Sequence, residues 1–188
     1  HHDIYSIEDI GQVILDLRQV NPGVRVTVKL VGITGIGAIA VGCAKAGCDV
    51  ILISGNAGGT GAANWSSIKH AGEDWETALA EAHQALVEKG WRNRVILRVD
   101  GGLRTARDVV IAAMLGADEF GFGTLPLLAV GCIMARRCHL PGKQGCPVGV
   151  ATQDPEQAAK YSGSPEQIMA MFTRLVEAVR ELMVELRV

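Results

Sequence analysis

Three cysteines lie close together in the stretch CIMARRCHLPGKQGCPVG, which runs from Cys132 to Gly149. In a reducing compartment, thiolates gathered in this way bind metal or carry out redox chemistry. Three sulfur ligands would suit an iron–sulfur cluster with one iron missing, and a proline follows Cys146 as in several iron–sulfur loops. Against a metal site, Cys132 lies in the helix-like run LLAVGCIMARR, where a buried thiol is common. The residues alone leave both interpretations open.

Two glycine-rich segments carry the strongest local signal, VDGGLRT at 99–105 and GFGTLP at 121–126. Each is expected to be the end of a strand that passes through glycine into the start of a helix. Backbone N–H groups and the helix dipole favour an anion at such a place. Tight turns alone would also explain the glycines, but two such loops at successive strand ends favour a phosphate site.

Lys29 and Asp100 are candidate polar groups at strand ends. A lysine inside VTVKLV interrupts a strand suited to burial, and a buried lysine is rare unless it is paired. It could balance negative charge on a flavin's N1/C2=O edge or on a substrate carboxylate, or it could be solvated. Asp100 precedes two glycines, so it could accept a hydrogen bond from a ligand hydroxyl or cap the turn.

A long loop, SGNAGGTGAANWSSIKHAG at 54–72, follows the second expected strand. Long irregular loops in compact domains are usually functional or disordered. Its core, GGTGAA, would allow the backbone to approach a ligand closely. Lys69 and His70 are candidates for contacting an acidic substrate, although a histidine on a loop is more often only solvated.

These residues need a framework, and the chain predicts one of repeated strand–helix units. A helix is expected from Ser6, where Ser6-x-x-Asp9 is a capping pattern, and a long one from Ser164-Pro165-Glu166-Gln167. Glycines at 47, 90 and 116 suit the left-handed position after a helix. The expected strands are 24–31, 49–55, 94–102 and 119–124, and the helices between them are 36–46, 74–89 and 104–115.

The expected strands are nearly continuous in hydrophobicity, which predicts burial on both faces of a parallel sheet. Their glycine-rich ends place the chemistry at the carboxyl edge of that sheet. A doubly wound sheet and a (β/α)8 barrel both fit this pattern. A whole barrel takes about 250 residues, so a barrel would make this chain a half.

Composition bounds the remaining choices. The 188 residues are 48% hydrophobic with a net charge of −2, so neither nucleic acid nor an anionic membrane surface is an expected partner. No apolar run approaches the roughly 20 residues of a membrane-spanning helix. The chain opens with polar residues, which predicts no signal peptide. Five cysteines is an odd number, which argues against a disulfide framework and favours the cytoplasm.

Longer motifs resemble one family. The segments HHDIYSIED, VTVKLV, VILISG, LRVDGGLRTARDVVIAAMLGADEFGFGT and CPVGVATQ are similar, in order and over nearly the whole chain, to the synthase domain of the glutamate synthase large (alpha) subunit. The resemblance implies the C-terminal half, about four βα units, of an FMN-binding (β/α)8 barrel. Residues 1–131 would form the half-barrel, 132–150 the iron–sulfur cysteine loop and 151–188 a C-terminal helical segment.

The resemblance also implies an oxidoreductase chemistry. Ammonia and 2-oxoglutarate would give 2-iminoglutarate, which reduced FMN converts to L-glutamate, with electrons arriving through a 3Fe–4S cluster. By motif, Lys29 would contact the flavin or the substrate as a catalytic residue, and Cys132, Cys138 and Cys146 would be the cluster ligands. The FMN would be held by Lys29, Ser54, Gly55, Asp100, Gly101, Gly102, Gly121, Gly123 and Thr124.

Three departures from the family pattern qualify this prediction. The loop from Cys138 to Cys146 is three residues longer than the usual Cys-His-Leu-Asn-Thr-Cys, and acidic residues are missing at 32–35 and at Asn56-Ala57. The alternative is a non-catalytic half-barrel assembly module that binds no flavin. A partner chain or a second copy would complete the barrel in either case, so an oligomer is expected. A different phosphate-binding barrel enzyme is a third possibility, against which the three cysteines argue.

Overall fold

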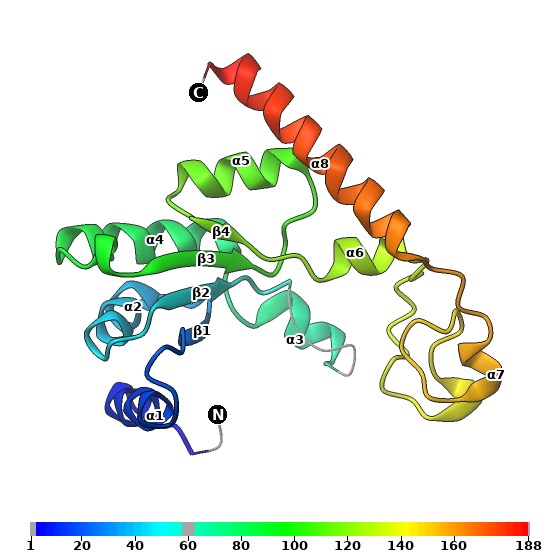
Figure 1. The fold of residues 1–188 in the computed structure, drawn as a ribbon, viewed down its shortest axis with the longest axis horizontal. Helices are drawn as coiled ribbons and strands as arrows, with labels where there is room; N and C mark the ends of the chain where they lie inside the picture. The colour runs from blue at the N-terminus through cyan, green and yellow to red at the C-terminus, as the bar shows by residue number, and fades with distance from the viewer. Residues whose placement is uncertain (1–2, 58–62, 188) are drawn as a thin grey trace.

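A parallel sheet forms the centre of the molecule (Figure 1). The computed structural model describes residues 3–57 and 63–187, with only the main chain at Ile68, and within them it holds one four-stranded sheet. All strands are parallel and neighbour one another in chain order. A doubly wound sheet reverses its strand order at a switch point, so this order favours the barrel. The strands are β1 (Thr27–Val31), β2 (Val50–Ser54), β3 (Ile96–Asp100) and β4 (Glu119–Phe120).

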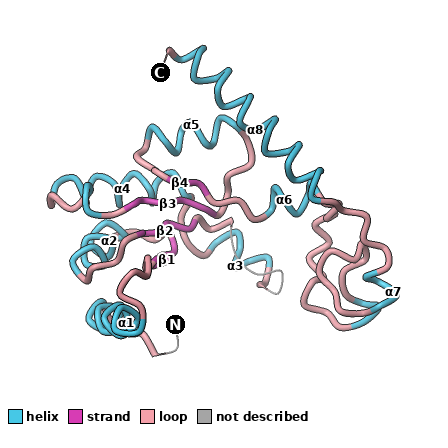
Figure 2. The backbone as a smooth tube through the Cα atoms, viewed as in Figure 1, coloured by secondary structure: helices cyan, strands magenta, loops and turns pink. Residues whose placement is uncertain are grey.

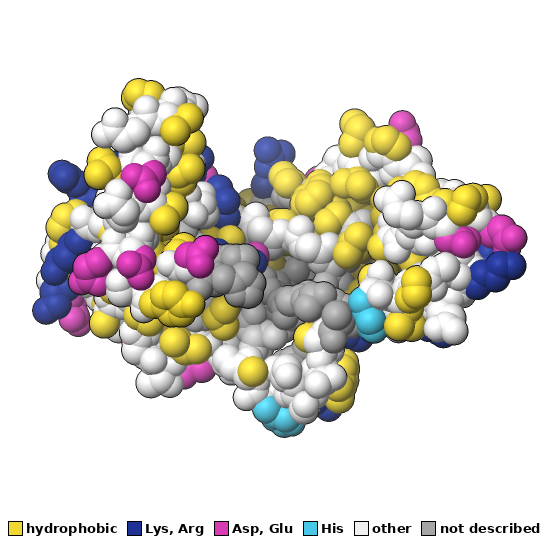
Figure 3. All heavy atoms as spheres, turned by 90° about the horizontal axis from the view of Figure 1, so that it is seen from below, with side chains coloured by type: hydrophobic (Ala, Val, Ile, Leu, Met, Phe, Trp, Pro, Cys, Tyr) yellow, Lys and Arg dark blue, Asp and Glu magenta, His cyan; other side chains and the backbone are white. Residues whose placement is uncertain are grey.

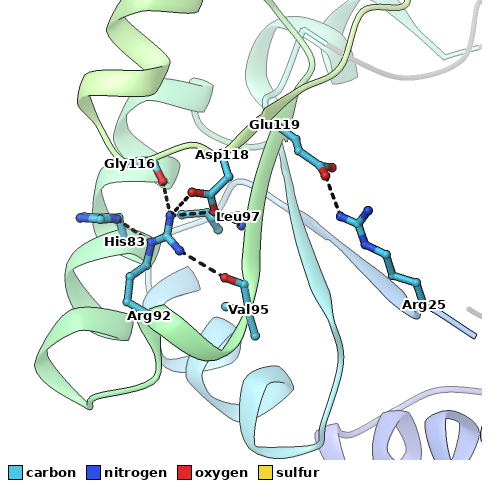
Figure 4. Close-up of polar contacts among 8 residues, drawn as sticks. All are labelled: Arg25, His83, Arg92, Val95, Leu97, Gly116, Asp118 and Glu119. Carbon is cyan, nitrogen blue, oxygen red and sulfur yellow. Dashed lines mark hydrogen bonds and ion pairs between the residues drawn. The ribbon is translucent and has the colours of Figure 1, made fainter. Parts of the chain in front are cut away.

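The sheet is curved, as part of a barrel must be. Arg25, just before β1, donates to Glu119 of β4 over 2.6 Å, although these segments lie at opposite edges of the sheet (Figure 4). Side chains stand roughly perpendicular to a sheet, so they meet across it only on a concave face. Arg98 of β3 pairs with the same carboxylate. Hydrogen bonds from Arg25 and then from Arg98 lower the pKa of Glu119.

Three helices cover the other face of the sheet: α2 (Ile36–Lys45), α4 (Trp75–Glu88) and α5 (Ala106–Met114). The helix α2 crosses α4 closely, because a Cβ added at Gly37 would lie 2.7 Å from the Cβ of Ala85. Glu81 of α4 accepts from the Gly37 amide, so its carboxylate caps the start of α2. The core lies between these helices and the sheet and includes Ile51, Ile53, Leu79, Leu86, Leu97 and Val99.

Local end signals were predicted correctly. The glycines at 47, 90 and 116 have φ of 94°, 71° and 105°, in the left-handed region. Helix α1 (Ile7–Val20) has the capping box of Ser6 and Asp9. Helix α8 (Pro165–Leu186) begins with proline, and the side chain of Gln167 accepts from the Ser164 amide over 2.8 Å.

Three strand predictions were wrong in extent. The strand β3 spans Ile96–Asp100 instead of 94–102, because Arg94 ends the short helix η1 (Arg92–Arg94) and a glycine turn follows Asp100. The strand β1 begins at Thr27 instead of 24, because the Val26 amide donates to the side chain of Asp49 over 2.7 Å and not to a neighbouring strand. The strand β4 has two residues, and beyond it the Gly121 amide makes one more ladder bond to Val99. The prediction that the strands are buried on both faces was wrong for β1, where alternate side chains are exposed on the concave face.

Helix α8 has an apolar stripe, and the rest of the described chain covers only part of it. No residue of α8 is fully buried; Phe172 packs edge-to-face on Phe122 with ring centroids 5.6 Å apart, whereas Leu186, at the end of the helix, is exposed. A hollow of about 370 Å³ lies between α5, β4 and α8 and is lined mainly by apolar side chains. No helix among the described residues is long and apolar enough to span a bilayer.

The segment that carries the three cysteines forms a lobe beside the sheet (Figure 2). Between α6 (Thr124–Ala129) and α8 it consists mostly of loops, with the short helices η2 (Gly142–Gln144) and α7 (Pro155–Ala158). Seen from below, the surface is hollowed between this lobe and the rest of the molecule (Figure 3).

Arg92, in the short helix η1 (Arg92–Arg94), ties together the end of the sheet opposite the strand-end glycines (Figure 4). Its guanidinium donates to the carbonyls of Val95 and Gly116, to the carboxylate of Asp118 over 2.8 Å and to His83 Nδ1 over 3.1 Å. Burial, and then the nearby charge of Arg92, lower the pKa of His83, which holds it in the neutral form that can accept this bond.

Replacing Arg92 by methionine is therefore expected to lower the free energy of unfolding by about 2–3 kcal/mol, because several partners of a mostly buried charge lose their donor. Urea unfolding followed by circular dichroism measures the change. Arg94→Met is the matched control, because the side chain of the exposed Arg94 contacts, among the described residues, only the ring of Trp91, and the change should alter stability by less than about 0.5 kcal/mol. Equal losses in both variants would contradict the role given to the Arg92 contacts.

Candidate functional site

The carboxyl ends of the strands open into a hollow of about 280 Å³, which we name the strand-end hollow. Of the predicted cofactor residues, Gly55 alone is absent from its lining; it is buried behind the hollow. Ala57, Leu103, Arg104 and Leu127 also line it and were not predicted. The predicted residues that it brings together are Lys29, Ser54, Asp100, Gly101, Gly102, Gly121, Gly123 and Thr124.

Lys29 and Asp100 form an ion pair in this hollow. The ammonium nitrogen lies 2.9 Å from Asp100 Oδ2, and the Lys29 side chain is 56% exposed. Asp100 Oδ1 is buried and has no hydrogen-bond partner within the described part of the chain. A buried carboxylate oxygen without a donor is costly, so it is a natural acceptor for a ligand hydroxyl. The described contacts give the Asp100 side chain no bond to a backbone amide of the following turn, as turn capping would require.

The glycines next to Asp100 are needed because two strand ends touch there. A Cβ on Gly101 would lie 2.7 Å from the Gly55 backbone, and a Cβ on Gly55 would lie 2.6 Å from the Gly101 carbonyl. Gly102 lies against the buried ring of Trp75, at 2.7 Å from an added Cβ, so Trp75 supports this loop from below. Trp75 was not among the predicted site residues, although it lies at the start of the helix expected at 74–89.

The two helix starts at the strand-end hollow differ. At α5, Thr105 and Asp108 form a capping box, in which Asp108 accepts from the Thr105 amide, and Asp108 also accepts from the Arg104 amide. These amides are therefore occupied. The start of α6 follows Gly123, and no side-chain cap is found there among the described residues. An anion would be met by the glycine turn and the start of α6, whereas at α5 the amides of Arg104, Thr105 and Asp108 are already used in capping.

The three cysteines line a second hollow of about 140 Å³, the cysteine hollow. Cys146 is 5% exposed, Cys132 is half-buried and Cys138 is exposed. The helical environment predicted for Cys132 was wrong: α6 ends at Ala129, and Gly131 with φ of 94° turns the chain into an irregular loop. The cysteine hollow and the strand-end hollow share Ala57, Thr124 and Leu127, so they are adjacent.

Backbone amides donate to two of these sulfur atoms, one amide to Cys132 and several to Cys146. The Met134 amide donates to Cys132 Sγ over 3.4 Å. Burial alone would raise the pKa of Cys146, but hydrogen bonds from the amides of residues 148–151 outweigh it and lower that pKa. By contrast, burial raises the pKa of Cys48 to about 12, as expected of an inert core thiol. Within the described residues, no three His, Cys, Asp or Glu side chains are arranged to hold a single metal ion.

The extra residues between Cys138 and Cys146 lie outside the cysteine hollow. Residues 141–145 form a turn around η2, and none of them lines that hollow. Lys143 of this turn pairs with Glu156 of α7 over 2.7 Å, with both side chains largely exposed. The longer loop is therefore accommodated on the lobe surface.

The loop after β2 is less irregular than predicted, because it contains the short helix α3 (Trp65–His70). The exposed Lys69 and His70 end this helix, and neither lines the strand-end hollow. Most of the GGTGAA core lies outside the described residues. A contact that the sequence did not suggest joins Trp65 of this loop to Arg136 of the cysteine lobe.

Solved structures share this architecture at low sequence identity. A double mutant of flavocytochrome b2 with sulfite bound aligns with 90% of this chain and 34% of its own at a TM-score of 0.54 and 15% identity. A single mutant of the same protein with benzoylformate aligns with 95% of this chain and 34% of its own at a TM-score of 0.55 and 16% identity. Together with the strand order, this likeness defines the chain as part of a (β/α)8 barrel, and the predicted fold class is confirmed.

Sequence comparison then places it within a family. The profile described as a conserved region in glutamate synthase matches residues 1–188. The chain is 58% identical over 183 residues to the glutamate synthase [NADPH] large chain of Azospirillum brasilense, with 97% of this chain and 12% of that one covered. It is 59% identical over 186 residues to the ferredoxin-dependent glutamate synthase of Cyanidium caldarium, with 99% and 12% covered.

The chain therefore belongs to the glutamate synthase family, a family of oxidoreductases, as its motifs predicted. It spans 12% of the length of these two relatives. It also covers 9% of the glutamate synthase [NADH] of Schizosaccharomyces pombe, at 53% identity.

Proposed function

We propose that this chain forms the part of a glutamate synthase that holds FMN next to an iron–sulfur cluster. The enzyme would reduce 2-iminoglutarate, made from 2-oxoglutarate and ammonia, to L-glutamate. The observation that carries the proposal is the adjacency of the two hollows, which share Ala57, Thr124 and Leu127. Transfer of electrons between two redox groups needs such closeness. Bound FMN would supply hydride, and the residues of the chain would hold and orient it.

The residues of the strand-end hollow fit FMN. Asp100 Oδ1, buried without a partner among the described residues, would accept from a ribityl hydroxyl. Lys29 would place its charge beside the flavin's N1/C2=O edge or a substrate carboxylate. The turn at Gly101-Gly102 and the uncapped start of α6 would hold the phosphate with backbone amides.

The cysteine hollow fits a 3Fe–4S cluster better than a single ion. Three thiols border one cavity without converging on one point, which suits a group larger than an ion. The amides that donate to Cys132 and Cys146 would stabilise thiolate ligands and tune the cluster. The exposed Cys138 would form the side of the cluster nearest to solvent.

Further chain segments are needed to complete this site. The concave face of the sheet is open at β1, where Thr27, Lys29 and Val31 are exposed, and α8 leaves apolar side chains uncovered. A further segment, a partner chain or a second copy would supply the missing strands. The open apolar surfaces also favour the second candidate, a non-catalytic half-barrel assembly module that binds no flavin.

Titration with FMN distinguishes the two candidates. Protein purified anaerobically is expected to quench flavin fluorescence on binding and to carry about three irons per chain with matching sulfide. Absorbance spectra with iron and sulfide analysis provide the measurements. Protein that is colourless once unbound FMN has been removed, and that contains no iron after reconstitution, would support the assembly module instead.

A further inference from the structure

Helix α3 is a short element that needs support from elsewhere. It has six residues, and the described contacts give its N-cap residue Asn64 no side-chain capping bond. Isolated helices shorter than about 12 residues are marginal in water. Trp65, its first residue, is 60% exposed. What holds this helix must therefore be a contact with another part of the chain.

That contact is with the cysteine lobe. The Trp65 ring lies under two cations, Lys69 Nζ at 5.0 Å from its centroid and Arg136 Cζ at 5.7 Å. Both distances are within the range of a cation–π interaction, worth about 0.5–1 kcal/mol at an exposed site. Lys69 belongs to the same helix, whereas Arg136 lies between Cys132 and Cys138. The contact with Arg136 thus joins the loop after β2 to the loop that carries two of the three cysteines.

The backbone on the lobe side is strained, so it also needs an anchor. Met134 and Arg136 both have φ of 54°, in the left-handed region. A residue other than glycine in this region costs roughly 1–3 kcal/mol and stays there only when its surroundings hold it. The same segment directs the Met134 amide at Cys132 Sγ. The position of that amide, and with it the setting of Cys132, depends on what holds Arg136.

We propose that Trp65 is a positioning residue for the cysteine hollow, because its ring fixes Arg136 and so the strained segment between Cys132 and Cys138. The link to an iron–sulfur cluster rests on the function proposed above, whereas the contact itself does not. Ala57, in the same loop, borders both hollows. The loop after β2 therefore touches the strand-end hollow with one part and steadies the cysteine loop with another.

A double-mutant cycle tests this role in the purified protein. The variants are Trp65→Leu, Arg136→Met and the two together, with Trp65→Phe as the conservative replacement and Arg94→Met as a remote control that breaks a similar contact over Trp91. One readout is the rate at which iodoacetamide modifies Cys132 in metal-free protein, measured by peptide mass spectrometry. The second is the rate of iron loss to a chelator after cluster reconstitution.

Trp65→Leu is expected to raise the Cys132 rate about two- to fivefold, as the loss of one exposed cation–π contact implies. Arg136→Met should raise it at least as much, and the double variant should match Arg136→Met. Trp65→Phe and Arg94→Met should stay near the wild type. Unchanged rates in Trp65→Leu, or single effects that add fully in the double variant, would overturn the proposal. So would an equal rise at the buried Cys43 and Cys48, which would report general loosening. Protein that never takes up iron would refute the cluster, while the iodoacetamide rates would still decide the role of Trp65.

Discussion

Replacing Cys146 by serine is expected to lower the iron bound per chain to background and to remove the visible absorbance of an iron–sulfur cluster. Cys146 is the most buried of the three cysteines and has backbone amides of residues 148–151 around its sulfur. A serine hydroxyl fits the same space but does not ionise readily to form a soft ligand. Iron and sulfide analysis after anaerobic reconstitution, with low-temperature electron paramagnetic resonance, measures the loss.

Cys48→Ser is the matched control for this experiment. Cys48 is also buried, but it lies in the core, and burial raises its pKa to about 12. The same chemical change there should leave the iron content unchanged. Full iron content in Cys146→Ser would remove Cys146 from the ligand set. Equal iron loss in both variants would point to a damaged fold instead of a lost ligand.

The cysteine loop shows what spacing in a sequence can predict. Cys132, Cys138 and Cys146 were expected together, and they line one hollow even though the last interval is longer than usual. A Pro-Gly turn can bulge outward without moving its ends, and the turn at 141–145 lies on the lobe surface. The hydrophobic run around Cys132 resembles a helix, but the prediction of a helix there was wrong, because α6 ends before Cys132 and Gly131 turns the chain away.

Signals that depend on near neighbours were the most reliable. Capping boxes and left-handed glycines involve residues within four positions of one another, and those at Ser6 and Gly47 are found as predicted. The misses depend on distant partners. The start of β1 is set by Asp49, 23 residues beyond Val26. No periodicity in a sequence reports which remote side chain will meet an amide or, as with Trp65 and Arg136, an aromatic ring.

Replacing Asp100 by alanine is expected to weaken FMN binding about 10- to 100-fold, because a buried charged acceptor for a ligand hydroxyl is worth about 1.5–3 kcal/mol. The variant also leaves Lys29 without the partner that now lies 2.9 Å away. Flavin fluorescence titration gives the dissociation constant. Asp74→Ala is the matched control, because it removes an exposed carboxylate from a neighbouring loop. The Asp74 side chain makes no capping bond among the described contacts. Its affinity for FMN should stay within about twofold of the wild type.

The two roles that the sequence left open for Asp100 predict different pairs of results. A turn cap would make Asp100→Ala lose stability with little change in FMN affinity, whereas a ligand acceptor would lose affinity with a nearly constant Tm. Oδ1, which has no hydrogen-bond partner among the described residues, favours the role as a ligand acceptor. Gly121→Ala tests it further, because an added Cβ would lie 2.9 Å from the Cβ of Asp100 and displace the carboxylate without removing its charge. Weaker FMN binding in both variants would assign the effect to the position of the carboxylate, and full affinity in Asp100→Ala would exclude Asp100 from the flavin site.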